Sequence, residues 1–250
     1  MDVRTGKKPK VLCLDLAETD YSEALELQRK LVCARVNGAL CYDVFLFLQH
    51  PPVFTLGRRG GREFIKVSEG LLKRAAISVV ATNRGGSITY HGPGQVVMYT
   101  VIDLETSGIE VVELVGLLEE VMIRTATVSG VKAGRDSRNR GVWVGSKKLG
   151  SVGLAVECGV TCHGIAFNVD VDLAPFSWIN PCGLTGVGMT SLSVEIGNLV
   201  GVEQVLPALK ANVEPCFSVS LMPVALKDIS SLILSSSLGS SGHLYSTRRV

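Results

Sequence analysis

One cysteine in this sequence has a setting suited to covalent chemistry. Cys182 stands between a proline and a glycine, in Asn-Pro-Cys-Gly-Leu, and this local sequence is typical of a turn. A thiol on a turn is more accessible than a thiol within a strand. A nearby cation then lowers its pKa and makes it a nucleophile. The alternative interpretation of Cys182 is a buried cysteine with a structural role.

A glycine-rich segment occupies residues 84–95, with the sequence R-G-G-S-I-T-Y-H-G-P-G-Q. Its four glycines and one proline predict a tight loop between two strands, which can present several N–H groups to an anion or a carbonyl. The segment is not a P-loop, because no Gly-Lys-Ser/Thr follows, and it lacks the Gly-x-Gly-x-x-Gly dinucleotide pattern. A plain turn is the alternative, but the segment also contains four side chains that favour a binding site: Arg84, Tyr90, His91 and Gln95.

A lysine precedes a second group of small residues. Lys148 begins a predicted strand, and Gly150, Ser151 and Gly153 follow it. Small side chains allow another backbone or an apolar chain to pass close to the strand. A solvated charge at a strand edge is the alternative interpretation of Lys148.

The seven cysteines do not predict a disulfide framework or a metal centre. Their number is odd, they are scattered, and no Cys-x-x-Cys pair occurs, so we expect reduced thiols. Residues 158–163 form Cys-x-x-x-Cys-His, but a further ligand at zinc spacing is missing. We therefore expect no metal and no cofactor, and we expect His163 to help shape a pocket.

The elements that must position these residues predict an α+β fold. Alternating or continuous apolar runs predict strands, and apolar residues at helical spacing predict two helices, the first capped by Asp20. Strict βαβ alternation is absent, which favours a mixed β-sheet core flanked by helices. The predicted strands are 10–16, 43–49, 77–82, 95–104, 141–144, 148–157 and 164–169, and the predicted helices are 21–37 and 109–128.

Composition excludes several classes of protein. The 250 residues include 19% charged residues, with a net charge of +2, and 46% hydrophobic residues, which excludes wholesale disorder and a coiled coil. The longest uncharged run, residues 173–194, contains two prolines, one asparagine and three glycines, so no membrane span is expected. The basic N-terminus lacks the apolar region of a secretory signal. We expect one domain over residues 10–215, a basic extension over 1–9 and a serine-rich, loosely attached tail over 224–250.

Together these segments resemble the lipoyl(octanoyl) transferases of the lipoate-protein ligase B family. Residues 84–95 are similar to the family signature R-G-G-x-x-T-[YF]-H-G-P-G-Q, and residues 50–58 resemble its upstream segment H-P-P-V-F-T-L-G-R. Residues 141–153 are similar to its G-V-W-V…K-x-x-x-x-G stretch, and residues 161–168 to T-x-H-G-x-x-x-N. Residues 181–183 resemble its nucleophile turn. The departures are Gly150-Ser151, where two alanines are common, and Phe167, where leucine is usual.

The resemblance implies a fold similar to the catalytic domain of biotin/lipoate protein ligases. It also implies an acyltransferase that moves an octanoyl or lipoyl group from acyl carrier protein to a specific lysine of lipoyl domains. Such acceptors occur in 2-oxoacid dehydrogenases and the glycine cleavage H protein, and the reaction is the first step of endogenous protein lipoylation. The group passes through an acyl-cysteine thioester, with Cys182 as nucleophile and Lys148 as its activator. The resemblance implies no nucleic-acid or membrane partner.

The resemblance also assigns a purpose to the glycine-rich segments. An octanoyl chain needs a narrow apolar tunnel, and burying about seven methylenes at roughly 0.8 kcal/mol each favours it by about 5 to 6 kcal/mol. We expect the tunnel to be lined by Arg84, Gly85, Gly86, Ser87, Ile88, Thr89, Tyr90, His91, Ser151, Val152, Gly153, Gly164, Ile165 and Ala166. Residues 51–100 hold seven Lys or Arg against two acids. Arg58, Arg59 and Arg62 in this segment are expected to steer an acidic carrier protein.

Two other functions compete with this prediction. An ATP-dependent lipoate or biotin protein ligase shares the implied fold but needs no cysteine nucleophile, so the presence of Cys182 and Lys148 favours the transferase. A silent module that only docks carrier or lipoyl domains requires that Cys182 be structural. The implied compartment is the cytoplasm in a bacterium, or the mitochondrion or plastid in a eukaryote.

Overall fold

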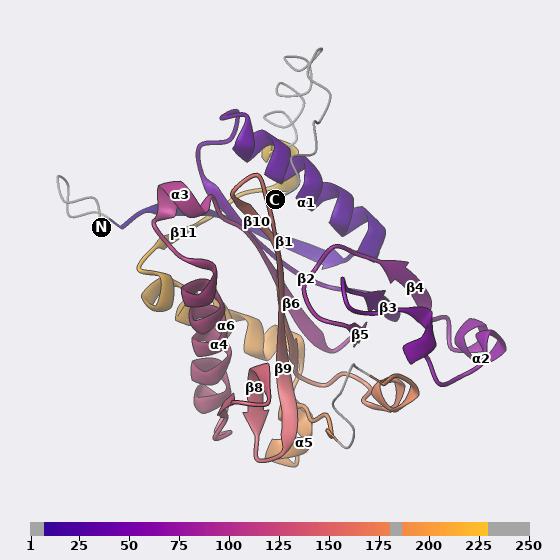
Figure 1. Cartoon of the computed structure of the whole chain (residues 1–250). Coiled ribbons are helices and arrows are strands. Elements are labelled where there is room, and N and C mark those ends of the chain that lie inside the picture. The colour runs from indigo at the N-terminus through magenta and orange to yellow at the C-terminus, as the bar shows by residue number, and fades with distance from the viewer. Residues whose placement is uncertain (1–7, 181–186, 230–250) are drawn as a thin grey trace.

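An eight-stranded mixed sheet forms the centre of the molecule (Figure 1). The computed structural model describes residues 8–180 and 187–229. The strand order is β11-β1-β2-β6-β10-β9-β8-β7, with β1 parallel to both of its neighbours and the other pairs antiparallel. The strands are β1 (Lys10–Glu18), β2 (Asp43–Gln49), β6 (Gln95–Val101), β7 (Gly134–Asp136), β8 (Asn139–Val144), β9 (Lys147–Glu157), β10 (Val160–Asn168) and β11 (Ser220–Pro223).

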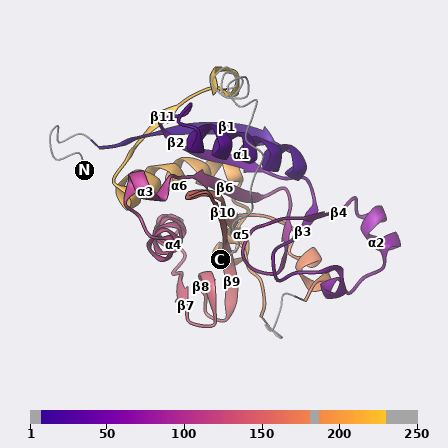
Figure 2. The same cartoon turned by 45° about the horizontal axis from the view of Figure 1, so that its top comes forward.

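A second sheet of three strands lies beside the large one, in the order β4-β3-β5. Figures 1 and 2 show it to one side of the central strands, together with a short helix. Its own small core contains Phe54, Leu72 and Tyr90. Its parts are β3 (Val53–Leu56), η1 (Arg62–Phe64), α2 (Glu69–Arg74), β4 (Ser78–Ala81), β5 (Ile88–His91) and η2 (Ala174–Trp178).

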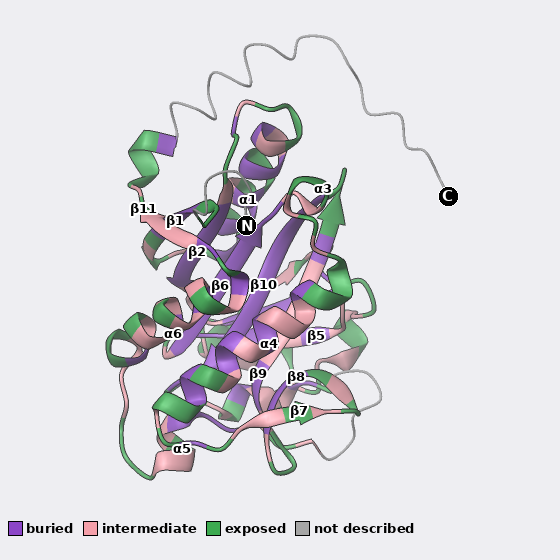
Figure 3. Ribbon diagram, turned by 90° about the vertical axis from the view of Figure 1, so that its left-hand side faces the viewer, coloured by how far each residue is buried: buried purple, intermediate pink, exposed green. Residues whose placement is uncertain are grey.

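Helices cover both faces of the large sheet. Helices α4 (Val111–Val128) and α6 (Val202–Phe217) pack on one face, and α1 (Tyr21–Val36) packs on the other. The shorter helices are α3 (Leu104–Ser107) and α5 (Leu192–Ile196). Figure 3 shows β2, β6 and β10 buried along most of their length between these layers. The predicted mixed sheet with flanking helices is therefore confirmed. Among the described residues, no helix combines the length and apolar character needed to cross a bilayer.

Several predicted elements are present with nearly the predicted bounds. Strand β2 matches its predicted range, and α1 begins where expected, with the Asp20 carboxylate accepting hydrogen bonds from the N–H groups of Ser22 (2.7 Å) and Glu23 (3.4 Å). The strand predicted over 95–104 is too long, because it ends at Val101. The chain turns there, since Asp103 caps the short helix α3.

The start of the predicted tail is attached to the body of the protein. The N–H of Val224 donates to the carbonyl of Cys13 (3.0 Å), and the side chain of Ile229 is buried in the core beneath α1. Loose attachment therefore does not describe residues 224–229. The other predictions for the chain ends are the basic extension and the remainder of the serine-rich tail. They fall mainly on residues 1–7 and 230–250, which lie outside the described residues.

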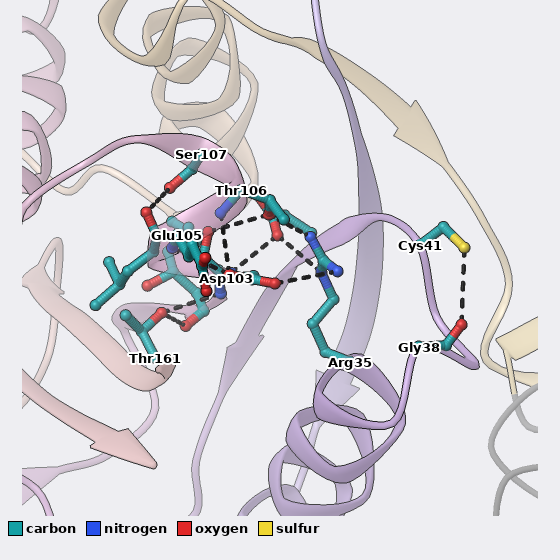
Figure 4. Close-up of polar contacts among 12 residues, drawn as sticks. Arg35, Gly38, Cys41, Asp103, Glu105, Thr106, Ser107 and Thr161 are labelled. Carbon is teal, nitrogen blue, oxygen red and sulfur yellow. Dashed lines mark hydrogen bonds and ion pairs between the residues drawn. The ribbon is translucent and has the colours of Figure 1, made fainter. Parts of the chain in front are cut away.

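A partly buried arginine ties α1 to the sheet and to α3 (Figure 4). The Arg35 guanidinium forms ion pairs with Asp43 (3.2 Å) and Asp103 (3.4 Å), and it donates a hydrogen bond to Thr106 Oγ1 (2.7 Å). The Arg35 side chain is only 10% exposed, so these charges are partly withdrawn from water. Burial raises the pKa of Asp43, while the hydrogen bond from Asp103 N–H and the arginine lower it.

Replacing Arg35 by methionine is expected to destabilise the fold by about 3 kcal/mol, because two partly buried carboxylates lose their partner. Urea unfolding followed by circular dichroism measures the change. Arg29→Met is the matched control, since Arg29 lies on the same helix, is 62% exposed and pairs with Glu26 at 4.0 Å. That control should change stability by less than about 0.5 kcal/mol. Equal losses of unfolding free energy in the two variants would contradict the conclusion that Arg35 ties α1 to the sheet and to α3.

Candidate active site

A cavity of about 270 Å³ opens where the small sheet meets β9 and β10. This volume is close to the lower end of the range for small-ligand pockets, which begins at about 300 Å³. The cavity is lined by residues from both sheets, from α1 and from the segments on either side of residues 181–186. The lining includes Tyr21, Arg59, Lys66, Arg84, Gly85, Gly86, Ser87, Ile88, Thr89, His91, Tyr99, Asn139, Lys148, Ser151, Val152, Gly153, His163, Gly164, Ile165, Ala166, Phe176, Ser177, Ile179, Asn180, Val187 and Met189.

Small residues paired across two strands form one wall of this cavity. Gly164 pairs with Gly153, and Ala166 pairs with Ser151, in the antiparallel register of β10 and β9. A Cβ atom added to Gly153 would meet Arg84 Cδ and the carbonyl of Gly85 at 3.4 Å, so the opposite wall lies within contact distance of this strand. These four small residues therefore leave a narrow space between the two walls.

Arg84 holds the opposite wall in place. Its guanidinium is buried, and it donates hydrogen bonds to Thr55 Oγ1 (Nε at 3.1 Å, Nη2 at 2.8 Å) and to the Thr55 carbonyl (2.6 Å). The N–H of Gly85 donates to the carbonyl of Leu154 on β9 (2.8 Å). Burial lowers the pKa of Arg84 from its usual value. These bonds join the small sheet to the large sheet beside the cavity.

Lys148 brings a partly buried amine to the cavity. Its Nζ donates to the carbonyl of Arg140 (2.8 Å) and to Asn139 Oδ1 (3.4 Å), and it lies 5.3 Å from the centroid of the Trp143 ring. Burial lowers the pKa of Lys148 to about 8, while the negative charge of Glu119 opposes this by raising it. Lys148 is thus not the solvated edge charge of the alternative interpretation but a partly desolvated amine, which can gain or lose a proton near neutral pH.

The backbone of Lys148 pairs with the chain that follows residues 181–186. The N–H of Lys148 donates to the carbonyl of Gly188 (2.9 Å), and the N–H of Thr190 donates to the carbonyl of Lys148 (2.9 Å). On the other side, the N–H of Asn180 donates to the carbonyl of Phe64 (2.8 Å). Cys182, the predicted nucleophile, lies outside the described residues. Asn180 and Val187, which flank its segment in the sequence, both line the cavity.

A chain of buried polar groups supports the same region. His91 Nδ1 is 2.7 Å from Gln95 Oε1, Gln95 Nε2 donates to Asn168 Oδ1 (2.9 Å), and Asn168 Nδ2 donates to the carbonyl of Thr190 (2.9 Å). Burial is the largest cause that lowers the pKa of His91, so this imidazole is neutral. The network connects β5, β6 and β10 to the segment that pairs with Lys148.

His163 also lines the cavity, as expected. Its Nε2 lies 2.7 Å from Asn83 Oδ1, and burial lowers its pKa to about 3. The ring stands edge-on to Tyr99, whose centroid is 6.0 Å away. Of the two neighbouring cysteines, Cys162 is buried and Cys158 is exposed. Within residues 8–180 and 187–229, no group of three His, Cys, Asp or Glu side chains could hold a metal ion.

The structure brings together Lys148 and every predicted tunnel residue except Tyr90. The Tyr90 ring packs edge-on against Phe54 (5.7 Å) and Phe176 (5.3 Å) in the core of the small sheet, and burial raises its pKa to about 12. Tyr90 belongs to the hydrophobic core of the small sheet and is not among the residues that line the cavity. The prediction that Tyr90 lines the tunnel is therefore wrong.

Sequence reasoning missed several lining residues that come from distant parts of the chain. Tyr21 begins α1, Tyr99 lies in β6, Phe176 belongs to η2, and Met189 follows residues 181–186. None belongs to a glycine-rich or nucleophile-like motif. A signal was present for Tyr99 alone, because it lies in a predicted central strand and carries a polar group that needs a partner. His50 Nε2 supplies it at 2.6 Å.

Comparison with known proteins shows consistent similarity. Residues 20–214 match the family described as Lipoyl protein ligase A/B catalytic domain. A protein of Desulfotalea psychrophila named Octanoyltransferase is 50% identical over 186 residues, 74% of this chain and 83% of its own length. Proteins of the same name from Caldicellulosiruptor bescii and Syntrophobacter fumaroxidans are 43% and 39% identical over 82% and 90% of this chain, and over 91% and 98% of their own lengths.

Solved structures share the fold at much lower sequence identity. A bi-partite lipoate protein ligase from Thermoplasma acidophilum superposes with a TM-score of 0.67 at 16% identity, covering 91% of each chain. A lipoate-protein ligase A bound with ATP superposes with a TM-score of 0.66 at 15% identity, covering 92% of this chain and 93% of its own. These similarities confirm the predicted likeness to lipoate protein ligase catalytic domains at the level of fold.

Proposed function

Because the chain belongs to the octanoyltransferases of the lipoyl protein ligase A/B catalytic domain family, we propose that it transfers an octanoyl group from acyl carrier protein to a specific lysine of lipoyl domains, through a thioester on Cys182. The family predicted from the motifs is confirmed by relatives at 39–50% identity. The predicted enzyme class, an acyltransferase, is confirmed with it. The carrier-protein donor, the lipoyl-domain acceptor and the roles of Cys182 and Lys148 form the proposal.

The first half-reaction exchanges one thioester for another. The Cys182 thiolate attacks the carbonyl carbon of the octanoyl thioester, the new carbon–sulfur bond forms, and the bond to the carrier sulfur breaks. The carrier leaves as a thiolate and takes up the proton that Cys182 lost on ionisation. The two thioesters are close in energy, so the step needs no ATP. A free thiol is only a few per cent ionised at pH 7, and a lysine ammonium within reach stabilises the thiolate. Lys148 supplies that ammonium.

The second half-reaction forms an amide. The amine of the acceptor lysine attacks the octanoyl carbonyl, the bond to Cys182 breaks, and one proton leaves the attacking nitrogen. Lys148 accepts this proton in its neutral form. A pKa of about 8 leaves about a tenth of Lys148 neutral at pH 7, far more than an exposed lysine has. The same side chain therefore serves both half-reactions.

One observation carries the proposal: the backbone of a partly desolvated lysine at the cavity is paired with the chain that follows residues 181–186, the segment to which Cys182 belongs in the sequence. Lys148 N–H bonds to Gly188, and Asn180 and Val187 line the cavity that Lys148 lines. The cavity wall of Gly153, Ser151 and other small residues supports a narrow acyl-binding site. This arrangement favours covalent acyl transfer over simple docking.

Exposed cations support an acidic carrier protein as donor. Arg58 and Arg59 are exposed, and Arg59 lines the cavity, so positive charge lies near its opening. Arg62 is also exposed, and it forms an ion pair with Glu69. We propose that Arg58, Arg59 and Arg62 together steer an acidic carrier protein. We propose a cytoplasmic site of action in a bacterium, or a mitochondrial or plastid one in a eukaryote.

Incubating the protein with octanoyl-acyl carrier protein in the absence of ATP tests the proposal. Intact-mass analysis should show a gain of one octanoyl group, and peptide mapping should place it on Cys182. Adding a lipoyl domain should then remove the group from the enzyme and place it on a lysine. An adduct that forms only with ATP and free octanoic acid would favour the ATP-dependent ligase instead.

Ala166→Val is expected to shift the preference from octanoyl toward shorter acyl groups. The larger side chain occupies space beside Ser151, so the ratio of kcat/KM for octanoyl over hexanoyl donors should fall by about tenfold. The ratio is measured with the two carrier-bound donors in competition. Ala155→Val is the matched control, because Ala155 is a small buried residue of β9 that does not line the cavity. An equal change in both variants would mean that the cavity wall does not select chain length.

A further inference from the structure

A single peptide group separates the Lys148 amine from a buried carboxylate. Lys148 Nζ donates to the carbonyl oxygen of Arg140 (2.8 Å), and the N–H of Gly141 donates to Glu119 Oε1 (2.8 Å). That carbonyl and that N–H belong to the same peptide unit. The positive amine thus lies at the oxygen end and the carboxylate at the hydrogen end. Both charges polarise the peptide in the same sense, which strengthens both hydrogen bonds.

The backbone at Gly141 is shaped so that the lysine can pass over it. Gly141 has a φ of +122°, a conformation that side-chain-bearing residues rarely adopt. A Cβ atom there would lie 2.7 Å from Lys148 Cε, 3.3 Å from Lys148 Nζ and 2.3 Å from the carbonyl of Gly150. The lysine side chain therefore lies directly against this glycine, and any change in the peptide orientation would move the amine.

Glu119 is poorly explained by packing alone. It lies on α4 among apolar neighbours such as Leu118 and Met122, and its side chain is 2% exposed. Its Oε2 accepts a hydrogen bond from Arg135 Nε (3.1 Å), and its Oε1 accepts the bond from Gly141. A buried ion pair is seldom better for stability than apolar residues of similar size. The placement of this carboxylate therefore points to the group that it reaches through the peptide.

We propose that Glu119 is a positioning residue for acyl transfer, which fixes the Lys148 amine at the cavity through the peptide group between residues 140 and 141. The inference rests on the proposed role of Lys148 in the reaction. Burial favours the neutral amine, and the negative charge of Glu119 opposes that preference, so the pKa of Lys148 stays near 8. Glu119 in this way keeps Lys148 able to act both as an ammonium and as a base.

Other charged groups lie around Lys148. Three cations line the same cavity from the side of the small sheet: Arg59 and Lys66 are exposed, and the buried Arg84 is bonded to Thr55. Arg135 on β7 is shared between Glu119 and Glu120, and Glu120 also pairs with Arg124. In the β7–β8 hairpin, the Arg138 guanidinium donates to both carboxylate oxygens of Asp136 (2.8 and 2.7 Å) and stacks on Trp143. The remaining cations on β8 and β9 are exposed, Arg140 and Lys147. Residues 187–191 bring no titratable side chain.

Glu119→Gln separates the charge from the hydrogen bond. Glutamine keeps an acceptor oxygen for Gly141 N–H but carries no charge, so the pKa of Lys148 should fall by roughly one pH unit. Competitive labelling of amines with acetic anhydride across a pH series, followed by peptide mass analysis, measures this pKa without any substrate. In the assay with octanoyl-acyl carrier protein, the alkaline limb of self-acylation should move to lower pH by the same amount.

Two further variants keep the test decisive. Arg135→Met leaves Glu119 without its cation and should raise the pKa of Lys148. Arg135 is half exposed, so this variant is expected to fold. It therefore provides the test if Glu119→Gln does not fold. Glu120→Gln is the matched control, since Glu120 binds Arg135 but not Gly141, and it should leave the pKa close to that of the wild type. An unchanged pKa in Glu119→Gln, or equal changes in the Glu119 and Glu120 variants, would overturn the inference.

The outcomes also separate this inference from the proposed function. If the wild-type protein forms no acyl-enzyme, the proposed function is overturned. The catalytic role of Glu119 is then overturned as well, even if labelling detects a lower pKa of Lys148 in Glu119→Gln. Wild-type protein that self-acylates while Glu119→Gln leaves both the pKa and the pH profile unchanged overturns the positioning role alone. A parallel movement of the pKa and the pH profile supports both.

Discussion

Cys182→Ala is expected to abolish octanoyl transfer, lowering kcat/KM by about 10⁴-fold or more, while leaving the melting temperature close to that of the wild type. The reason is chemical: without the sulfur no acyl-enzyme forms, and the acceptor amine would have to attack the carrier thioester directly. The measurements are the rate of lipoyl-domain octanoylation and the intact mass of the enzyme after incubation with the donor.

Cys41→Ala is the matched control for this variant. Cys41 is an exposed free cysteine in the connection between α1 and β2, and it does not line the cavity. The control should retain both the octanoyl adduct and the full rate of transfer. Transfer that persists in Cys182→Ala would mean that Cys182 is structural, and the silent docking module or the ATP-dependent ligase would then have to be reconsidered.

Lys148→Arg is expected to lower the rate of transfer by about 10³-fold, although it preserves the positive charge. A guanidinium does not release its proton near neutral pH, so it cannot accept a proton from the acceptor amine. It is also larger than an ammonium, and the Lys148 side chain lies against Gly141 and Trp143 with little room. Rates of the two half-reactions, measured separately by rapid quench, test this prediction.

The rate of the second half-reaction is expected to depend on pH through the protonation of Lys148. The amine is charged below its pKa of about 8 and neutral above it, so deacylation by the acceptor should rise with pH and level off above about pH 8. Lys148→Arg should lose this inflection together with the rate. Lys147→Arg is the control, because Lys147 is the exposed neighbour on β9. A near-normal rate in Lys148→Arg would remove the general-base role.

The sequence predicts much of the large sheet because its central strands are continuous apolar runs. Residues 43–49 form β2 with its predicted bounds, buried on both faces. Helix α6 was not predicted, because Pro207 and Pro215 interrupt it and proline is unfavourable inside a helix. Its apolar face offsets that cost by packing Val205, Leu209 and Val213 into the core. Tertiary packing of this kind has no local signature.

The residues of the candidate site were likewise predictable only in part. The motif residues and their small neighbours were identifiable because their types are unusual: glycines, a lysine before a run of small residues, and a cysteine between proline and glycine. Strand β5 was hidden within the glycine-rich segment, because only its pairing with β3 makes Ile88–His91 extended. Glu119 could not be identified from the sequence, because a glutamate in a helix is typically exposed. Only the folded structure shows that it accepts hydrogen bonds from Gly141 and Arg135.

The paired small residues of β9 and β10 have a consequence for redesign. A Cβ atom at Gly164 would lie 2.1 Å from the carbonyl of Met98, so this position admits no substitution, whereas Gly153 has room for a methyl group at ordinary contact distance. Ser151, Gly153 and Ala166 are then the positions at which graded side chains could retune the enzyme toward other fatty acids. Because the walls are joined by main-chain hydrogen bonds and by the Arg84 side chain, such variants would retain the scaffold while changing the acyl length that it accepts.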